Sequence, residues 1–352
     1  MRWQHLINLQ ALCAPALAQS LKEALEANGF TLWAQRISTD NLLLNAGPGI
    51  IIYAPTNAAL ESSDDANSPI TRRADDKDKQ EAENAASAVD STAPRPPKPE
   101  KPSQNNTATR RQLVNTAGSA QVTLLDNPEF VNLGPGRNQV IVEKNVASWS
   151  LPLVFSGLGR AVKVTGDDIP YDNGVIRPID GMVTLPENVS TTLPYLGVDT
   201  FQDLVTQSGI LNELDNRASI TLLVPDDNAF KSIAKRSKTG FEDLIRQHIL
   251  VDFPAYTPLL ENGDVYPTLA GGNVTVLIRD GLIYLNGAQI LAGDAIVTNG
   301  VVHVIDKVLG GSPVAPPATV TGAASAVMGP MLWEVLVGGF GVVAATRYFN
   351  LV

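Results

Sequence analysis

One stretch near the end of the chain, residues 299–309, has the strongest local pattern, and a weaker copy of it lies upstream. The stretch begins with Asn-Gly, continues as a β-branched run and includes Ile305-Asp306. Asn-Gly between two apolar β-branched runs is typical of a tight hairpin in which both turn residues adopt φ > 0. Residues 173–180 repeat the Gly, two aliphatic residues and the Ile-Asp pair at identical spacing. The sequence therefore predicts one module present twice.

A second pattern is also duplicated. Residues 221–230 predict a buried strand, a proline turn and a helix start, and residues 51–60 repeat this order. We expect Thr56 or Asn57 to cap the first of these helices. Pro225 and Gly300 are 75 positions apart, whereas Pro55 and Gly174 are 119 apart, an excess of 44 residues in the first copy. That excess is close to the length of one polar insertion.

The insertion spans residues 61–112 and differs in composition from the rest of the chain. It interleaves acidic and basic residues, is rich in proline over residues 94–102 and has no aromatic residue. Such a segment buries too little apolar surface to offset the entropy of ordering, so it is predicted to be disordered. The predicted modules are residues 19–186, including this insertion, and residues 193–310. A formal net charge of −10 gives no basic footprint for nucleic acid.

The first 18 residues predict a secretory signal peptide. Arg2 precedes an apolar stretch over residues 6–14, and Ala16-Leu17-Ala18 fits the small-x-small cleavage rule. The alternative is an ordinary amphipathic N-terminal helix. The single cysteine, Cys13, lies in this segment, so the mature chain is expected to form no disulfide. Three Asn-x-Ser/Thr sequons agree with a secretory route, at Asn105, Asn188 and Asn273.

The C-terminal region predicts attachment to a membrane. Residues 311–326 form a linker of Pro, Ala and other small residues, and residues 327–352 form a hydrophobic tail. Small residues followed by an apolar tail are typical of glycolipid anchor attachment, with Gly322, Ala323 and Ser325 as the candidate positions. The tail is also long enough for a membrane-spanning helix, but Glu334 and Arg347 make a permanent span less favourable. We therefore expect a cell-surface protein with a glycolipid anchor.

We call residues 221–230 and their copy at 51–60 the first box of each module, and residues 299–306 and their copy at 173–180 the second box. These duplicated boxes resemble the motifs of the fasciclin-like domain family. Residues 221–230 and 299–306 match its two motifs well, whereas residues 51–60 and 173–180 match them in part. The family has Tyr-His between the boxes, and here His248 is kept after Gln247; the first module has Arg177 where the second has His303. The leader, double module and anchor-like tail together look like a fungal cell-surface member.

The resemblance implies a fold class and a function. The fold is α+β, with each module a β-sandwich-like wedge that has helices packed at one side. The function is non-enzymatic adhesion at the cell surface or in the matrix, with a protein or polysaccharide partner and no cofactor. A carbohydrate- or lipid-binding module of the cell wall is the alternative, which exposed aromatic residues along one face would favour. Nucleophile-elbow and phosphate-loop motifs are absent, so no enzyme activity is expected.

The motif residues of the second module are the candidate site residues, and each has a structural alternative. His248 and His303 are adhesion-motif residues, metal ligands or core histidines bonded to backbone. Asp306 is an acidic ligand for an integrin-like partner or a turn-fixing carboxylate, and Asp226-Asp227-Asn228 is a degenerate calcium loop or a helix cap. The full candidate set is Pro225, Asp226, Asp227, His248, Gly300, His303, Ile305 and Asp306.

Overall fold

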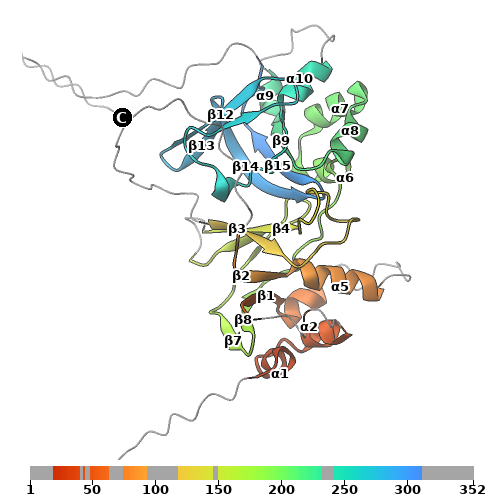
Figure 1. Ribbon diagram of the computed structural model, residues 1–352, viewed down its shortest axis with the longest axis vertical. Coiled ribbons are helices and arrows are strands. Elements are labelled where there is room, and N and C mark those ends of the chain that lie inside the picture. The colour runs from red at the N-terminus through yellow and green to blue at the C-terminus, as the bar shows by residue number, and fades with distance from the viewer. Residues whose placement is uncertain are drawn as a thin grey trace, which may run out of the picture. The chain divides into compact units, whose positions relative to one another are not determined.

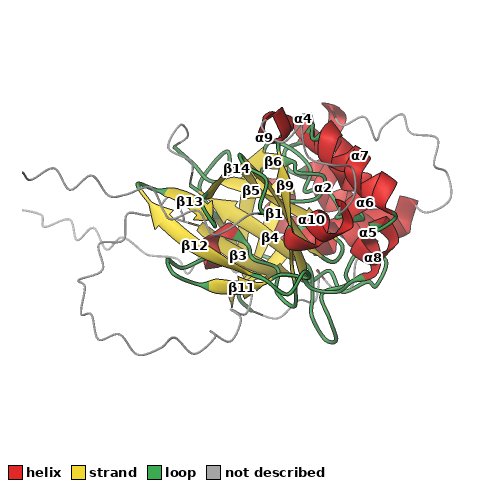
Figure 2. Ribbon diagram, turned by 90° about the horizontal axis from the view of Figure 1, so that it is seen from above, coloured by secondary structure: helices red, strands yellow, loops and turns green. Residues whose placement is uncertain are grey.

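The structure is a computed structural model, in which two sheets come from successive halves of the chain (Figure 1). Helices gather at one side of the strands (Figure 2). The predicted α+β fold with two related modules is therefore confirmed. The structure describes residues 19–39, 43, 48–62, 74–92, 118–145, 150–231 and 241–310.

The helices of each half are short. In the first half they are α1 (Leu21–Ala27), α2 (Thr31–Arg36), η1 (Ile37–Thr39), α4 (Asn57–Ser62) and α5 (Ala74–Asn84). In the second half they are α6 (Val189–Thr192), η3 (Leu193–Leu196), α7 (Asp199–Ser208), α8 (Leu211–Asn216), α9 (Asp227–Lys231), α10 (Phe241–Gln247) and η4 (Thr257–Leu259). None of these described helices is both long and apolar enough to cross a bilayer.

The strands of the first half form one sheet in the order β6-β5-β4-β3-β2-β1-β8-β7. They are β1 (Ile50–Pro55), β2 (Ala86–Thr92), β3 (Gly118–Thr123), β4 (Val140–Lys144), β5 (Leu153–Phe155), β6 (Ala161–Lys163), β7 (Ile169–Tyr171) and β8 (Gly174–Ile179).

The second sheet has the order β10-β9-β15-β14-β13-β12-β11. Its strands are β9 (Ile220–Pro225), β10 (Ile249–Leu250), β11 (Val265–Pro267), β12 (Asn273–Arg279), β13 (Leu282–Leu285), β14 (Ala288–Val297) and β15 (Gly300–Ile305). Two tight turns of this sheet are formed by Asp280-Gly281 and Asn286-Gly287, and all four residues have the positive φ that type I′ turns require.

Each half is built around a parallel pair formed by its two motif strands. β1 pairs with β8 so that Ile50 faces Gly174, and β9 pairs with β15 so that Ile220 faces Gly300. The two registers are the same, and both end on the proline of the first box, opposite the isoleucine of the second. Every residue of β1 and of β9 is buried, as expected of strands covered on both faces. The internal repeat predicted from spacing is thus present in the strand pairing.

The insertion was predicted to be disordered, and this is wrong for residues 74–92. They form α5 and β2, and β2 lies between β1 and β3 in the first sheet. Ala82, Ala85 and Ala86 are at most 2% exposed, so small side chains form this contact. β2 holds the place that β10 holds beside β9 in the second half. Low hydrophobicity concealed the strand because alanine and serine can pack closely without a long apolar run.

The turn at the second box also differs from its prediction. Val297 pairs with Gly300, so the turn residues are Thr298 and Asn299, and Gly300 already belongs to β15. Asn299 does not have the positive φ of a type I′ turn. The hairpin itself is confirmed, since β15 pairs back onto β14 as predicted. The reason for glycine here is close packing against β9.

The two halves share part of their core. One cluster belongs to the first half, two belong to the second, and a fourth contains residues from both. In the shared cluster Leu133 and Val142 pack with Tyr256, Ile296 and Val301. Thr298 O also accepts a hydrogen bond from Asn132 N–H at 2.6 Å. These contacts place an apolar and hydrogen-bonded boundary between the repeats.

Candidate functional site

The first motif box of the second half positions a helix. Pro225 ends β9, and the Asp226 N–H donates to Ile305 O at 2.9 Å. Asp226 Oδ1 accepts from Ala229 N–H at 2.8 Å, which caps α9. Asp227 Oδ1 accepts from Thr200 N–H at 2.9 Å and so connects α9 to α7. The helix-cap interpretation therefore describes Asp226.

The first half repeats these bonds with other side chains. Thr56 Oγ1 accepts from Ala59 N–H at 3.2 Å, and Asn57 Oδ1 accepts from Leu32 N–H at 3.1 Å. Thr56 is thus the capping residue, while Asn57 ties two helices together as Asp227 does. The pattern of side-chain to backbone hydrogen bonds is the same in both halves, although a hydroxyl and an amide take the places of the two carboxylates.

The aspartate of the second box fixes a neighbouring strand in both halves. Asp306 Oδ1 accepts from Gln289 N–H at 2.7 Å, and Asp306 N–H donates to Gln289 O. Asp180 makes the same two bonds with Lys163, with a side-chain distance of 2.7 Å. This repeated geometry makes both carboxylates turn-fixing groups.

Gly300 is required by backbone contact. A Cβ at this position would lie 1.9 Å from Ile220 O, and one at Gly174 would lie 1.8 Å from Ile50 O. Both glycines therefore let the second-box strand approach the first-box strand. Ile305, at the other end of β15, is fully buried opposite Pro225.

His303 is buried on β15 and bonded on both ring nitrogens. Its Nδ1 accepts from Asp294 N–H at 3.1 Å, and its Nε2 lies 2.9 Å from Ala255 O. The ring is therefore neutral with its proton on Nε2. Burial lowers the pKa of His303, while the nearby Asp294 carboxylate opposes that shift. The core-histidine alternative fits this geometry.

Asp294 is a buried carboxylate that was not among the residues predicted from the sequence. It lies at an irregularity of β14, has a φ of 66° and is fully buried. Its Oδ2 lies 2.6 Å from Lys144 Nζ and also accepts from Thr257 Oγ1, and Oδ1 accepts from Thr257 N–H at 2.8 Å. Burial alone raises the pKa of Asp294, but Lys144 and these bonds hold that pKa below its ordinary value.

The first half has a different set of charges at the matching place. Arg177 corresponds to His303, and its guanidinium makes a bidentate pair with Asp168, at 2.6 and 2.7 Å. Glu143 Oε2 accepts from Arg177 Nη1 at 2.6 Å and from Tyr53 Oη at 2.7 Å. The first half therefore has an arginine-centred network at the place where the second half has His303.

His248 is the second histidine of the candidate set. Leu309 N–H donates to its Nε2 at 2.8 Å, and its Nδ1 lies 2.8 Å from Leu244 O. The ring is fully buried, packs edge-on against Phe201 and is neutral. Burial lowers the pKa of His248 to about 4, against the opposing bond to Leu244. This histidine holds the end of the second repeat against α10.

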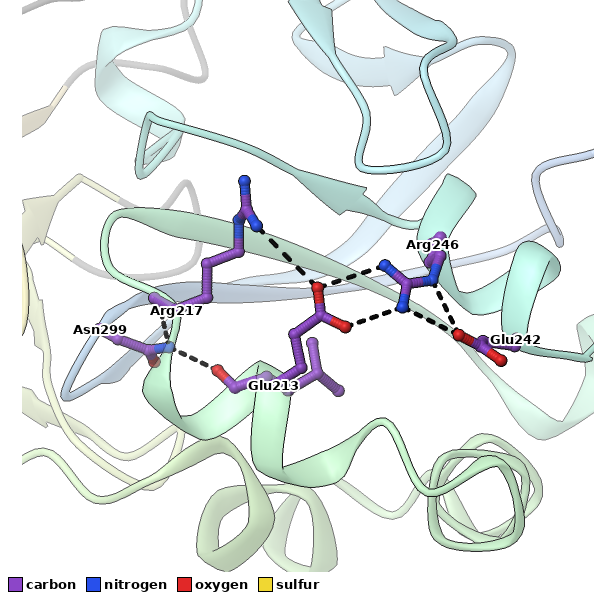
Figure 3. A network of polar contacts seen from close by, with 6 residues as sticks. Glu213, Arg217, Glu242, Arg246 and Asn299 are labelled. Atoms are coloured by element: carbon purple, nitrogen blue, oxygen red, sulfur yellow. Dashed lines mark hydrogen bonds and ion pairs between the residues drawn. The ribbon is translucent and has the colours of Figure 1, made fainter.

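Asn299 joins the second box to α8, as Figure 3 shows. Its Nδ2 donates to Leu214 O at 2.6 Å and to Arg217 O at 2.7 Å. Beside it, Glu213 Oε2 pairs with Arg246 Nη2 at 2.9 Å, and the same nitrogen lies 2.8 Å from Glu242 Oε1. These half-exposed groups connect α8 to α10 at the surface.

Among the described residues no three His, Cys, Asp or Glu side chains converge to hold a metal. The motif residues bond to backbone and thereby set the fold. Asn188 and Asn273 are exposed. Residues 1–18 with the predicted leader, Asn105, and residues 311–352 with Gly322, Ala323 and Ser325 lie outside the described residues.

Comparison with known proteins gives consistent matches. Residues 196–311 match the family described as "Fasciclin domain". The "Fasciclin-like arabinogalactan protein CTB11" of Cercospora beticola is 29% identical over 219 residues, covering 61% of this chain and 59% of that protein. The "Fasciclin-like arabinogalactan protein elcF" of Phaeosphaeria nodorum is 31% identical over 157 residues, covering 44% of this chain and 50% of that protein.

One solved structure also aligns with this chain. A FAS1 domain pair from the insect cell adhesion molecule Fasciclin I aligns with a TM-score of 0.35 and 18% identity, over 81% of this chain and 98% of that chain. The chain spans about half to three fifths of the length of the two curated relatives.

Proposed function

Because the chain carries a fasciclin domain over residues 196–311, we propose that it is a non-enzymatic adhesion protein of the cell surface or matrix. Its partner is a surface or matrix protein or polysaccharide. A signal peptide directs it to the secretory route, and the C-terminal tail anchors it to the membrane through a glycolipid. Asn188 and Asn273, both exposed, are the described positions for glycosylation.

The family match is the observation that carries this proposal, and the site geometry supports it. Three motif side chains, those of Asp226, Asp306 and His303, make hydrogen bonds to backbone groups that hold the fold. A protein whose motif residues serve as scaffold binds through the surface that the scaffold presents. Recognition is therefore assigned to the loops and exposed faces of the repeats.

The alternative of a carbohydrate-binding face has less support. Such a face needs several exposed aromatic rings that stack on sugars. Tyr195, at 59% exposure, is the one aromatic residue among the strongly exposed large apolar side chains of the described chain. The aromatic residues instead contribute to the core, as Trp33, Tyr53 and Phe201 do.

Display of the full chain on cells tests the proposed function. Cells expressing it should adhere to matrix or partner cells more strongly than cells without it, and a phospholipase that cuts glycolipid anchors should release it and remove the adhesion. The intact mass of the released chain should show a start at Gln19 and added glycan. Equal adhesion with and without the chain, or retention of an unglycosylated chain inside the cell, contradicts the proposal.

A further inference from the structure

A cavity of 180 Å³ lies where the two halves meet. Its walls are the apolar side chains of Val122, Leu133 and Val140 from the first half and Phe253, Pro254 and Tyr256 from the second. Tyr256 also belongs to the core cluster that both halves share. The cavity is therefore formed only when the repeats are packed together.

The volume sets the size of a ligand. An engineered apolar cavity of about 150 Å³ binds benzene, whereas sites for drug-sized molecules run from about 300 to 1,000 Å³. A space of 180 Å³ therefore fits one six-membered ring with a small substituent. Phe253 is held rigidly for such a ring, because it stacks on Tyr266 with centroids 5.6 Å apart and planes 3° from parallel.

The cavity wall includes the side chain of Arg137, which is exposed and forms no ion pair in the described part of the chain. Tyr256 lines the same cavity, but the residue is 1% exposed and its hydroxyl is buried, without a hydrogen bond among the described residues. The surface that Tyr256 gives to the cavity is therefore its apolar ring, and Arg137 is the charged group that a ligand there can reach.

We propose that this cavity binds a single-ring aromatic carboxylate. The ring lies among the apolar walls beside Phe253 and Pro254, and the carboxylate faces the Arg137 guanidinium. An arginine is suited to this task because its guanidinium binds a carboxylate in a bidentate manner. The inference rests on the cavity and is independent of the adhesion function.

Calorimetric titration of the full chain with benzoate, 4-hydroxybenzoate and the neutral benzyl alcohol tests the proposal. Both carboxylates should bind, and benzyl alcohol should bind at least tenfold more weakly. Arg137→Gln should weaken benzoate at least tenfold while leaving benzyl alcohol unchanged. The matched control is Arg160→Gln, which removes the same charge from an exposed position away from the cavity walls and should have no effect.

A further variant fills the cavity. Val122→Phe places a ring in the cavity and should abolish binding of all three probes. Absence of benzoate binding to the folded wild-type chain at millimolar concentration overturns the proposal. Equal affinities of benzoate for wild type and Arg137→Gln overturn it as well.

Discussion

Lys144 Nζ lies 2.6 Å from Asp294 Oδ2, and the two residues belong to different repeats. The lysine side chain is 14% exposed and the aspartate side chain is fully buried. Lys144 also lies over the ring of Phe155, 4.1 Å from its centroid. One repeat therefore supplies the counter-charge for a carboxylate in the core of the other.

Lys144→Met is predicted to destabilise the chain by about 3 to 5 kcal/mol, because it leaves the Asp294 carboxylate buried and uncompensated. Urea unfolding of the full chain measures the change. The double variant Lys144→Met with Asp294→Asn is the control, and it should recover part of the loss because the buried charge is gone. Equal stability of wild type and Lys144→Met contradicts a charge-compensating role.

Gly300→Ala is predicted to cost about 3 kcal/mol, since the added Cβ would sit 1.9 Å from Ile220 O in a packed parallel pair. Gly174→Ala should behave alike, because its Cβ would lie 1.8 Å from Ile50 O. Gly271→Ala is the matched control: it has φ of 82° but open space around it, so about 1 kcal/mol is expected. Thermal and urea unfolding compare the three. A loss at Gly300 no larger than at Gly271 would show that contact with β9 is unimportant.

Stability is predicted to fall as the pH drops from about 6.5 to about 4. His248 stays neutral in the folded chain because burial lowers its pKa to about 4, whereas in the unfolded chain it titrates near 6.5. Below 6.5 the unfolded chain therefore binds a proton that the folded chain does not, and about 3 kcal/mol is lost by pH 4. Urea unfolding across this range measures the slope, and His248→Gln should reduce it. An imidazole NMR titration of folded His248 centred near pH 6.5 is the contrary result.

Val302→Asp is predicted to unfold the second repeat, with a loss above about 4 kcal/mol. Val302 is 1% exposed and packs in the core, so the substitution buries an unpaired charge. The control is Leu291→Asp in the same hairpin, where the side chain is 51% exposed and little change is expected. Circular dichroism on heating compares the two. Unchanged melting of the Val302 variant contradicts the buried strand.

Deletion of residues 61–112 is predicted to remove most of the stability of the first repeat. The deletion removes β2, whose neighbours β1 and β3 then lose their pairing. Limited proteolysis and urea unfolding should report a first half that no longer resists cleavage. A deleted chain as stable as wild type would mean that β2 contributes nothing to the sheet.

The sequence was sufficient to predict what is local and repeated. Pro225 and Gly300 mark two boxes whose apolar runs form the parallel pair, and the same spacing located Pro55 and Gly174. Composition failed at β2, because Ala86 and Ser87 pack as a buried strand without large apolar side chains.

The charged contacts could not be predicted because they depend on distant residues. Lys144 and Asp294 are 150 positions apart, and Asp294 faces inward only because β14 changes register. A β-bulge of this kind interrupts the two-residue alternation on which strand prediction relies. The orphan hydroxyl of Tyr256 was hidden for the same reason, since its surroundings come from both halves.

The shared core cluster has a consequence for how this chain can be divided. Cutting it between Pro186 and Leu193 would expose Leu133 and Val142 on one fragment and Tyr256 and Val301 on the other, all now buried together. Each fragment would carry an exposed apolar face prone to aggregation. The C-terminal fragment would also keep the Asp294 carboxylate without Lys144, its counter-charge. The two repeats are therefore not independent units. Either one, moved to another protein, would need a new apolar partner in place of the repeat it packs against here.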